Sequence, residues 1–564
     1  MNELDCSRKF LLVPHFTLLA IFAIIFLKNP QNKQSFLPLP YSAQAAMTYF
    51  LTNDSGVFLP MVYRRSAIQA PRVKWEGKGC FSSWCQTGWY SSPAVINLDS
   101  DPQLEILVGT YDLVALDGLT GETQWRATNS NRVWPGVALA DLTGDGLLEI
   151  IIGRSGDHVS VYDLAGNEVW TRHPFGDGEV RSLAIGDLDD DSKVEIIVGR
   201  ASGGSTRQVN VFESDGNVRP GFPARRDGEA GYGWGMYNQN LGLANLDGLP
   251  GLEIIAPTDT HYITALDQNG NQLPAHFMYN AFNPQGNKVW SQVGVHVEHA
   301  VDLRGYAQCG IEHRPNFADS PPSLADLDGN GSIEIVVIGN VYNCGSDPYT
   351  SLYQMPFIFK FDRSRWSSGP FDWTAIPLPD SASAPLSEQY QVIETVSPAP
   401  VLADLDSDGF LEIVYASYDG RVHAYWLDKK EHGQWPFSVN DPGEGLIRFA
   451  SEPVIADLDN DSKAEVIFTS WTQKNSGRTG KLHLLSHTGE VLYEIDLPNA
   501  RNGGWNGAMA APTLADIDQD GELEITVNTA HSGVVVYDLP RTAGYRLLWP
   551  TGRGNFWRNG LVVR

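Results

Sequence analysis

One acidic pattern recurs along the chain and constrains its fold more than any other feature. In ADLDSDGFLEIV, residues 403–414, oxygen-bearing side chains stand at positions 1, 3 and 5 of a loop that ends with glutamate at position 9. A short run such as EILVG or EIVVI follows and is typical of a buried strand. The eight copies, numbered loops 1 to 8, begin at Asn97, Asp141, Asp187, Asn245, Asp326, Asp404, Asp457 and Asp516. The chain is therefore predicted to fold as a series of β units.

The spacing within each loop predicts a metal site. Alternate side chains of a tight turn can converge on one point, and the glutamate can approach from the far side with two oxygens. Hard oxygen ligands without nitrogen or sulfur suit Ca²⁺, whereas Mg²⁺ requires a stricter octahedron. An EF-hand does not explain the pattern, because its glutamate stands at position 12 and its loop lies between helices. The remaining alternative is a set of acidic turns without a metal.

Most loops offer four side chains to the predicted ion. The predicted ligands are Asn97, Asp99, Asp101, Glu105, Asp141, Thr143, Asp145, Glu149, Asp187, Asp189, Asp191, Glu195, Asn245, Asp247, Glu253, Asp326, Asp328, Asn330, Glu334, Asp404, Asp406, Asp408, Glu412, Asp457, Asp459, Asp461, Glu465, Asp516, Asp518, Asp520 and Glu524. Loop 4 has Leu249 at position 5 and is expected to be empty or weak. We expect structural calcium, up to about eight ions per chain.

The formal net charge of −27 is largely a property of these loops. A bound cation would neutralise carboxylates that border buried strands, where unpaired charge is costly. The acidity therefore describes ion sites more than a partner. It argues against nucleic acid as a ligand, because nucleic acid binding requires a basic face.

The loop and the VVG-like strand after it resemble the calcium-binding FG-GAP repeat of integrin α-subunit propellers and its bacterial relatives, the VCBS repeats. The resemblance covers residues 89–559. The family's Phe-Gly pair is replaced by pairs such as Ser92-Pro93 and Ala399-Pro400, which places the chain with the bacterial variant. This departure removes the basis for integrin-type partners. The resemblance implies calcium turns that join strands 1 and 2 of each blade on one face of a propeller.

Four short strands are expected in each unit, as in SPAVINL, EILVGTY, LVALDG and TQWRAT of the first. In the last unit they are PTLADI, LEITVNT, GVVVYDL and YRLLWPT, the fourth being residues 545–551. Four antiparallel strands form a propeller blade. The prediction is an all-β, eight-bladed propeller over residues 73–564, with seven blades as the alternative. Insertions at about 273–320 and 340–397 are expected on the face opposite the calcium turns, where we expect the function.

The N-terminal part is predicted to export the propeller. The apolar run at residues 10–27 makes residues 1–28 a signal peptide or an N-terminal membrane anchor, and residues 29–72 a linker. The protein would be secreted or held at the cell surface, with membrane contact only through residues 10–27.

The five cysteines agree with export. Cys80 and Cys85 are expected to pair, as are Cys309 and Cys344, while Cys6 precedes the apolar run. The alternative of a zinc site lacks CxxC spacing.

Two groups of residues are candidates for a site. The first is a histidine-rich cluster in the first insertion, for which a catalytic or metal role competes with a hydrogen-bonded cover: His276, His296, Glu298, His299, Asp302, Arg304, Glu312 and His313. The second is the set Trp89, Trp134, Trp234 and Trp505, which precede first strands and could contact a ligand or pack. Tryptophans late in the units are expected between blades: Trp125, Trp170, Trp290, Trp435 and Trp549.

Three function classes remain. The first is a non-catalytic binding or adhesion module for an extracellular protein or glycan. The alternative is a polysaccharide lyase or hydrolase, for which no acid–base pair can be assigned from the sequence. A quinoprotein-like dehydrogenase is suggested only by hairpins such as VALDGLTGETQW, and the recurring loops argue against it.

Overall fold

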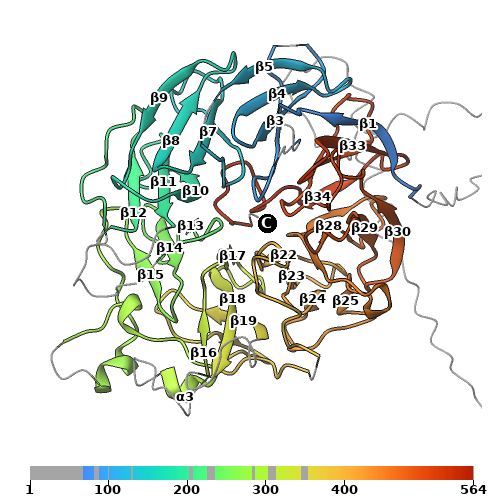
Figure 1. The fold of residues 1–564 in the computed structure, drawn as a ribbon. Coiled ribbons are helices and arrows are strands. Elements are labelled where there is room, and N and C mark those ends of the chain that lie inside the picture. The colour runs from blue at the N-terminus through green and yellow to red at the C-terminus, as the bar shows by residue number, and fades with distance from the viewer. Residues whose placement is uncertain are drawn as a thin grey trace, which may run out of the picture. The chain divides into compact units, whose positions relative to one another are not determined.

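The computed structural model describes residues 68–562 apart from short gaps, and these residues form a ring of β-sheets (Figure 1). The gaps are residues 82–84, 86–87, 100, 129–130, 202–206, 225–234, 283–285, 303–312, 344–352 and 381. The predicted apolar helix at residues 10–27 lies outside the described residues. Within the described part, no helix is long and apolar enough to cross a membrane.

Eight blades surround the centre of the ring, which confirms the predicted all-β propeller. Blade 1 contains β2 (Ala94–Ile96), β3 (Glu105–Gly109), β4 (Leu113–Asp117) and β5 (Thr123–Ala127). Blade 2 contains β6 (Ala138–Ala140), β7 (Glu149–Arg154), β8 (His158–Tyr162) and β9 (Glu168–Arg172). Blade 3 contains β10 (Val180–Gly186), β11 (Glu195–Arg200) and β12 (Val209–Phe212), and blade 4 contains β13 (Gly242–Ala244), β14 (Glu253–Pro257) and β15 (Ile263–Leu266).

The second half of the ring has longer and additional strands. Blade 5 contains β17 (Ser323–Ala325), β18 (Glu334–Asn343), β19 (Tyr353–Phe359) and β16 (His313–Asn316), which pairs with β18. Blade 6 contains β22 (Val401–Ala403), β23 (Glu412–Ala416), β24 (Arg421–Tyr425) and β25 (Phe437–Ser438). Blade 7 contains β27 (Val454–Asp457), β28 (Glu465–Thr472), β29 (Lys481–Leu485) and β30 (Val491–Asp496), with β26 (Arg448–Ala450) paired to β28. Blade 8 contains β31 (Thr513–Ala515), β32 (Leu523–Asn528), β33 (Val534–Leu539) and β1 (Arg72–Lys78).

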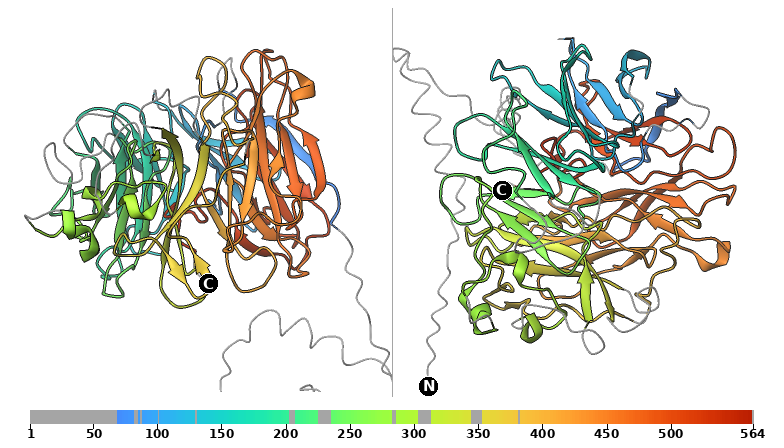
Figure 2. Two further views of the ribbon diagram at one scale, coloured as in Figure 1. Left: turned by 90° about the horizontal axis from the view of Figure 1, so that it is seen from below. Right: turned by 60° about the vertical axis from the view of Figure 1, so that its left-hand side comes forward.

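The inner strands of each blade are apolar because neighbouring blades cover both of their faces. All six residues of β7 are buried, whereas the outer strand β9 is buried only at Trp170. The glutamate at position 9 of each loop lies at the start of the second strand and faces the residue that precedes position 1, as in the pair Ala403 and Glu412. This shared register places the loops on one face of the ring, which the left panel of Figure 2 shows from the side.

The ring is closed by the first strand of the described chain. β1 pairs with β33 and is the outer strand of blade 8. The expectation that residues 545–551 form this outer strand is wrong. β34 (Arg546–Trp549) instead pairs with β27, the innermost strand of blade 7. Hydrophobic patterning identifies a strand but not its partner, so the error arises from assuming that neighbours in sequence pair in space.

Tryptophans on outer strands join adjacent blades, as predicted for Trp125 and Trp170. The indole N–H of Trp125 donates to Leu164 O of blade 2 at 3.0 Å, and that of Trp170 donates to Ser214 O of blade 3 at 3.2 Å. Trp75 of β1 makes the equivalent bond to Gly118 O of blade 1 at 2.8 Å. The same bond is made by Trp290, Trp373 and Trp435 to Phe361, Leu427 and His487. Trp549 does not join blades in this way, because it lies on β34.

Residues 550–560 occupy the centre of the ring (Figure 1). Backbone N–H groups of innermost strands donate to carbonyl oxygens of this segment, which we call the central segment, in five blades: Leu139 to Phe556, Ile185 to Trp557, Leu243 to Asn559, Leu324 to Gly560 and Leu514 to Pro550. Arg553 and Arg558 are fully buried within it. The Arg558 guanidinium donates to Val137 O at 2.7 Å and to Pro93 O at 3.0 Å. The central segment therefore satisfies strand edges that would otherwise lack partners.

The first insertion is not confined to the face opposite the loops, contrary to expectation. It includes η1 (Phe277–Phe282), η2 (Trp290–Gln292) and α3 (His299–Asp302). His276 N donates to Asp362 O at 2.8 Å. Asp362 follows β19 in the turn after the third strand, which lies on the loop face. Val295 N then donates to His261 O, in the turn between the second and third strands. The insertion thus runs along the rim from one face to the other.

The second insertion reaches the opposite face as predicted. It contains the short hairpin of β20 (Ser367–Ser368) and β21 (Phe371–Asp372), and then crosses to blades 6 and 7. Leu386 N donates to Tyr418 O in the turn between β23 and β24. Lys474 N, in the turn after β28, donates to Val392 O. Another short helix, η3 (Pro442–Glu444), precedes β26.

Candidate metal-binding loops and the opposite face

The position-9 glutamate has the same role in every loop. The backbone N–H of position 2 donates to Oε2 of the glutamate at 2.6 to 3.0 Å in all eight loops. In loop 6, Leu405 N is the donor and Glu412 the acceptor, at 2.7 Å. One glutamate oxygen therefore closes the hairpin in every loop, while the other, Oε1, accepts from Gln124 in loop 1 and from Lys74 in loop 8.

Aspartates shape the rest of the loop. In loop 6, Asp404 accepts bonds from the N–H groups of Asp408 at 3.1 Å and Gly409 at 3.0 Å. Asp408 accepts one from Phe410 N at 2.9 Å. Gly409 has φ of +94°, a conformation that glycine adopts readily. Each of these carboxylates has a second oxygen or lone pair that the turn does not use.

In five of the loops, three of the predicted carboxylates converge. Oxygens within 4.8 Å of one another belong to Asp99, Asp101 and Glu105; Asp187, Asp189 and Glu195; Asp326, Asp328 and Glu334; Asp404, Asp406 and Glu412; and Asp457, Asp459 and Asp461. Oδ1 of Asp328 in loop 5, and Oδ1 of Asp406 and Oε1 of Glu412 in loop 6, are buried without a hydrogen-bond partner among the described residues, as are Oδ1 of Asp189 in loop 3 and of Asp516 in loop 8. Buried carboxylate oxygens of this kind are costly unless a cation compensates them. The residues therefore fit a hard divalent cation.

The pKa values of the position-9 glutamates also favour a bound cation. Burial, together with the nearby Asp406, raises the pKa of Glu412 to about 9. Burial and Asp459 raise the pKa of Glu465 to about 8. In loop 4, where position 5 is leucine, burial raises the pKa of Glu253 only to about 6. A cation held by the same oxygens would favour the charged glutamates and oppose these shifts.

A family model described as the FG-GAP-like repeat matches residues 404–468. The matched segment begins at loop 6 and continues into β28 of blade 7, and the eight-bladed ring agrees with the match. The chain is thus an eight-bladed β-propeller that contains an FG-GAP-like repeat. No curated protein matches its sequence.

Several solved structures match this chain at low similarity. The V. cholerae biofilm matrix protein Bap1 is 14% identical with a TM-score of 0.40, over 88% of this chain and 96% of that one. BamB from Moraxella catarrhalis is 13% identical with a TM-score of 0.39, over 79% and 96% of the two chains. Quinohemoprotein alcohol dehydrogenase from Comamonas testosteroni is 14% identical with a TM-score of 0.40, over 85% and 77%. Similarity at this level carries no inference about function.

Three of the eight loops contact a basic side chain from another part of the chain, and no motif in the sequence predicts these contacts. Arg219 pairs with Asp189 of loop 3 at 2.7 Å, and Arg546 pairs with Asp457 of loop 7 at 3.0 Å. Lys74 of β1 pairs with Glu524 of loop 8 at 3.0 Å. The acidic residues of the FG-GAP loops are thus not equivalent, although their sequences are alike.

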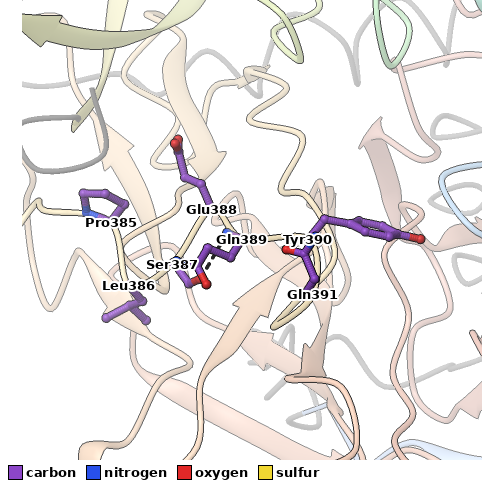
Figure 3. Close-up of a pocket in the computed structure, with 7 residues that line it drawn as sticks. All are labelled: Pro385, Leu386, Ser387, Glu388, Gln389, Tyr390 and Gln391. Carbon is purple, nitrogen blue, oxygen red and sulfur yellow. Dashed lines mark hydrogen bonds between the residues drawn. The ribbon is translucent and has the colours of Figure 1, made fainter. Parts of the chain in front are cut away.

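A pocket of about 540 Å³ lies on the face opposite loops 1 to 8, where Leu386 bonds to the turn between β23 and β24. Figure 3 shows the described residues that line it, which belong to the second insertion: Pro385, Leu386, Ser387, Glu388, Gln389, Tyr390 and Gln391. Tyr390 is 57% exposed, and the Lys474 ammonium lies 3.2 Å from the centre of its ring. Burial and the nearby Asp319 raise the pKa of Glu388 to about 7. No sequence motif marks this pocket, so it was not predicted.

The tryptophans that precede first strands pack against their surroundings. Trp89, Trp134 and Trp505 are each 8% exposed. The Trp89 and Trp505 rings meet edge to face at 6.3 Å, and Arg181 lies over Trp134 at 3.7 Å. The described rings therefore support the opposite face and do not form an open stacking platform. Trp234 lies outside the described residues.

The histidine-rich cluster does not assemble a metal site from its described members. His296 is buried, and its backbone N–H donates to Asp302 Oδ1 at 2.6 Å. The other Asp302 oxygen accepts from Arg365 Nε at 2.7 Å. His276 lies near Asp362, at 3.9 Å, on the loop side of the ring. These contacts favour a structural role for the described part of the cluster. Glu298 forms an isolated antiparallel β-bridge with Ala375, and His299 is the first residue of α3. Arg304, Glu312 and the side chain of His313 lie outside the described residues.

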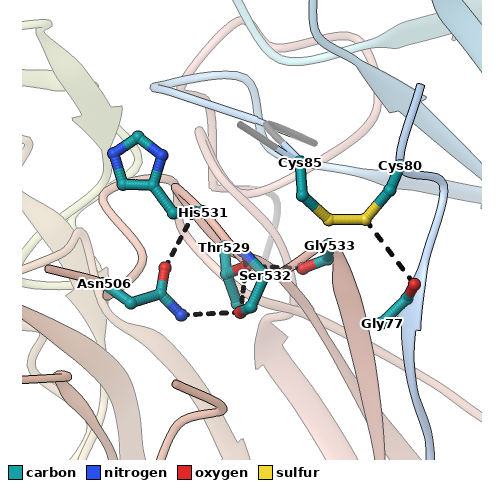
Figure 4. Close-up of a disulfide and its surroundings, with 8 residues drawn as sticks. All are labelled: Gly77, Cys80, Cys85, Asn506, Thr529, His531, Ser532 and Gly533. Atoms are coloured by element: carbon teal, nitrogen blue, oxygen red, sulfur yellow. Dashed lines mark hydrogen bonds between the residues drawn. A yellow bond between two sulfur atoms is a disulfide. The ribbon is translucent and has the colours of Figure 1, made fainter. Parts of the chain in front are cut away.

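Cys80 and Cys85 are placed as a disulfide, the pairing expected from the sequence (Figure 4). Their Cα atoms are 4.5 Å apart, and Cys85 O accepts a bond from Gly533 N of blade 8 at 3.1 Å. The bridge therefore lies directly after β1, the strand that closes the ring. Cys6, Cys309 and Cys344 lie outside the described residues.

Proposed function

We propose that this chain is an exported, calcium-stabilised propeller that binds a glycan at the pocket of residues 385–391 and has no catalytic role. The calcium would be structural, held by the FG-GAP loops on one face. Loop 6 carries this proposal, because Asp406 and Glu412 leave buried carboxylate oxygens without a partner among the described residues. Calcium supplies the missing charge there, and its binding adds to folding stability. The paired positions of Cys80 and Cys85 support an oxidising compartment.

The chemistry of the pocket favours a glycan over a protein ligand. Its wall offers hydroxyl, carboxylate and amide groups from Ser387, Glu388 and Gln389, which can bond to sugar hydroxyls. The exposed Tyr390 adds an aromatic surface held in place by Lys474. A protein interface of ordinary size would instead need a larger apolar patch with buried anchors.

Metal analysis tests the calcium. We expect purified full-length protein, dialysed against calcium and then against metal-free buffer, to retain calcium when measured by mass spectrometry of the elements. Glu412→Gln should retain one ion fewer, because it removes a ligand and the charge of loop 6. The control Glu168→Gln changes an exposed residue of β9 and should retain the wild-type number. A wild-type protein free of calcium, or an unchanged count in Glu412→Gln, would contradict the assignment.

A glycan array tests the ligand. We expect labelled wild-type protein to bind a subset of the sugars, and Tyr390→Ala to bind them at least about tenfold more weakly, as when about 1.4 kcal/mol of contact energy is lost. Phe277→Ala is the matched control, because Phe277 is 76% exposed on η1 of the other insertion. An equal loss of sugar binding in both variants, or no sugar bound by the wild type, would contradict the proposal.

A further inference from the structure

We infer that loops 3 and 8 hold a basic side chain of the protein itself where the other loops hold calcium. Lys74 fills this place in loop 8 and Arg219 fills it in loop 3. The inference rests on the proposed calcium binding and limits which loops take part in it. It also implies that the strand that closes the ring is secured without metal.

Lys74 is directed into loop 8 by an irregularity in β1. The pairing of β1 with β33 shifts register between Val73 and Trp75, so Lys74 is the extra residue of a β-bulge. Its ammonium donates to Asp518 Oδ2 and, at 3.0 Å, to Glu524 Oε1. These are positions 3 and 9 of the loop. The Lys74 side chain is only 15% exposed and that of Glu524 is fully buried.

An ammonium and a calcium ion cannot share this position. Calcium bound to the same two carboxylates would lie about 2.3 to 2.6 Å from each oxygen. The Lys74 nitrogen already lies within hydrogen-bond distance of both, and the repulsion between it and a divalent ion would be strong at such separation. Loop 8 therefore does not fit calcium while Lys74 is in place.

Arg219 repeats the arrangement in loop 3. It lies 2.7 Å from Asp189 and 3.8 Å from Glu195, again positions 3 and 9. Its Nε donates to Gln268 O of blade 4 at 3.0 Å. In most other blades, the equivalent hydrogen bond to the next blade is donated by a tryptophan side chain. Arg219 is 8% exposed, and Glu213 also pairs with it at 3.1 Å. Arginine at this point both joins the blades and neutralises the loop.

The other loops differ in their surroundings. Among the described residues, no lysine, arginine or histidine forms an ion pair with the acids of loops 1, 2, 5 and 6. Near loop 6, Lys463 donates to the backbone oxygen of Asp406 and not to a carboxylate. In loop 7, Arg546 is 48% exposed and pairs with Asp457 at position 1. Calcium is thus expected in loops 1, 2, 5 and 6.

Removing the lysine should create a calcium site. We expect Lys74→Met to retain one calcium ion more per chain than the wild type, measured by elemental mass spectrometry and native mass spectrometry after the same dialysis. Its melting temperature should also fall more on addition of EGTA than that of the wild type. The matched control is Lys78→Met on the same strand, because Lys78 pairs with Glu122 outside any loop. This control should keep the wild-type calcium count.

A second variant makes the test independent of whether Lys74→Met folds. Asp518→Asn should leave the calcium count unchanged, whereas Asp406→Asn in loop 6 should lower it by one. If the wild type binds calcium but Asp518→Asn loses an ion, or folded Lys74→Met gains none, the inference is overturned. If the wild type binds no calcium at all, the proposed calcium binding itself fails, and the two failures are therefore distinguishable.

Discussion

Replacing Glu452 by glutamine should lower the free energy of unfolding by about 3 to 5 kcal/mol, the range for leaving a buried charge without the opposite charge that compensates it. Glu452 is 6% exposed, and its Oε1 accepts bonds from Arg553 N at 2.7 Å and from Trp549 Nε1 at 3.2 Å. Burial lowers the pKa of Arg553 to about 10 and of Arg558 to about 9, and the charge of Glu452 opposes both shifts. Because glutamine retains an acceptor oxygen for these hydrogen bonds, the loss of stability measures the contribution of the negative charge of Glu452.

Equilibrium unfolding in urea, followed by tryptophan fluorescence, measures this effect. The control Glu76→Gln changes an exposed residue of β1 and should alter the free energy by less than about 0.5 kcal/mol. A change in Glu452→Gln as small as that of the control would mean that the two buried guanidinium groups are stabilised by backbone carbonyls alone.

Replacing Trp75 by alanine should lower the free energy of unfolding by about 3 to 5 kcal/mol, as for other buried tryptophans. Trp75 is 8% exposed and packs between blades 8 and 1 with Val95, Ile106 and Val534. A side chain added at Gly121 would meet its ring at 2.8 Å, so the indole fits closely on that turn. The variant removes both this packing and the bond to Gly118, and so weakens the contact that closes the ring.

Two companion variants separate ring closure from strand propensity. Trp75→Phe keeps most of the apolar area and should lose only about 1 kcal/mol, the value of the indole hydrogen bond. Val73→Ala alters a residue of the same strand that is 51% exposed and should have an effect below about 1 kcal/mol. Native-state hydrogen exchange of Trp75→Ala should show faster exchange in β33, the partner strand of β1. Unchanged exchange in β33 would contradict the closing role of β1.

The blades could be predicted from sequence because their signals are local. Residues 105–109 read EILVG and form β3, and each loop fixes the register of the two strands beside it. The role of β1 could not be predicted in the same way. Its sequence, RVKWEGK, shares only a central tryptophan with the outer strands TQWRA and EVWTR. That shared tryptophan is the signal that could have identified it.

The positions of loops 1 to 8 could be predicted from the sequence, but the differences between these loops could not. Lys74 and Asp518 are 444 positions apart in sequence, and only the closed ring brings them together. Arg219 lies in a segment without any repeat signature, so no local sequence pattern predicts its contact with Asp189. The pocket around Tyr390 belongs to an insertion, where sequence periodicity gives no information about position.

The central segment also bears on the order in which the protein can mature during synthesis. Residues 550–560 leave the ribosome after all eight loops, yet innermost strands of five blades bond to them. Until then, the inner edges of blades 2 to 5 present unpaired backbone groups, which are prone to pair with other chains. A ribosome that stalls within the last blade would therefore release a nearly complete propeller without its hub, and such a product should be recognised by chaperones as unfinished.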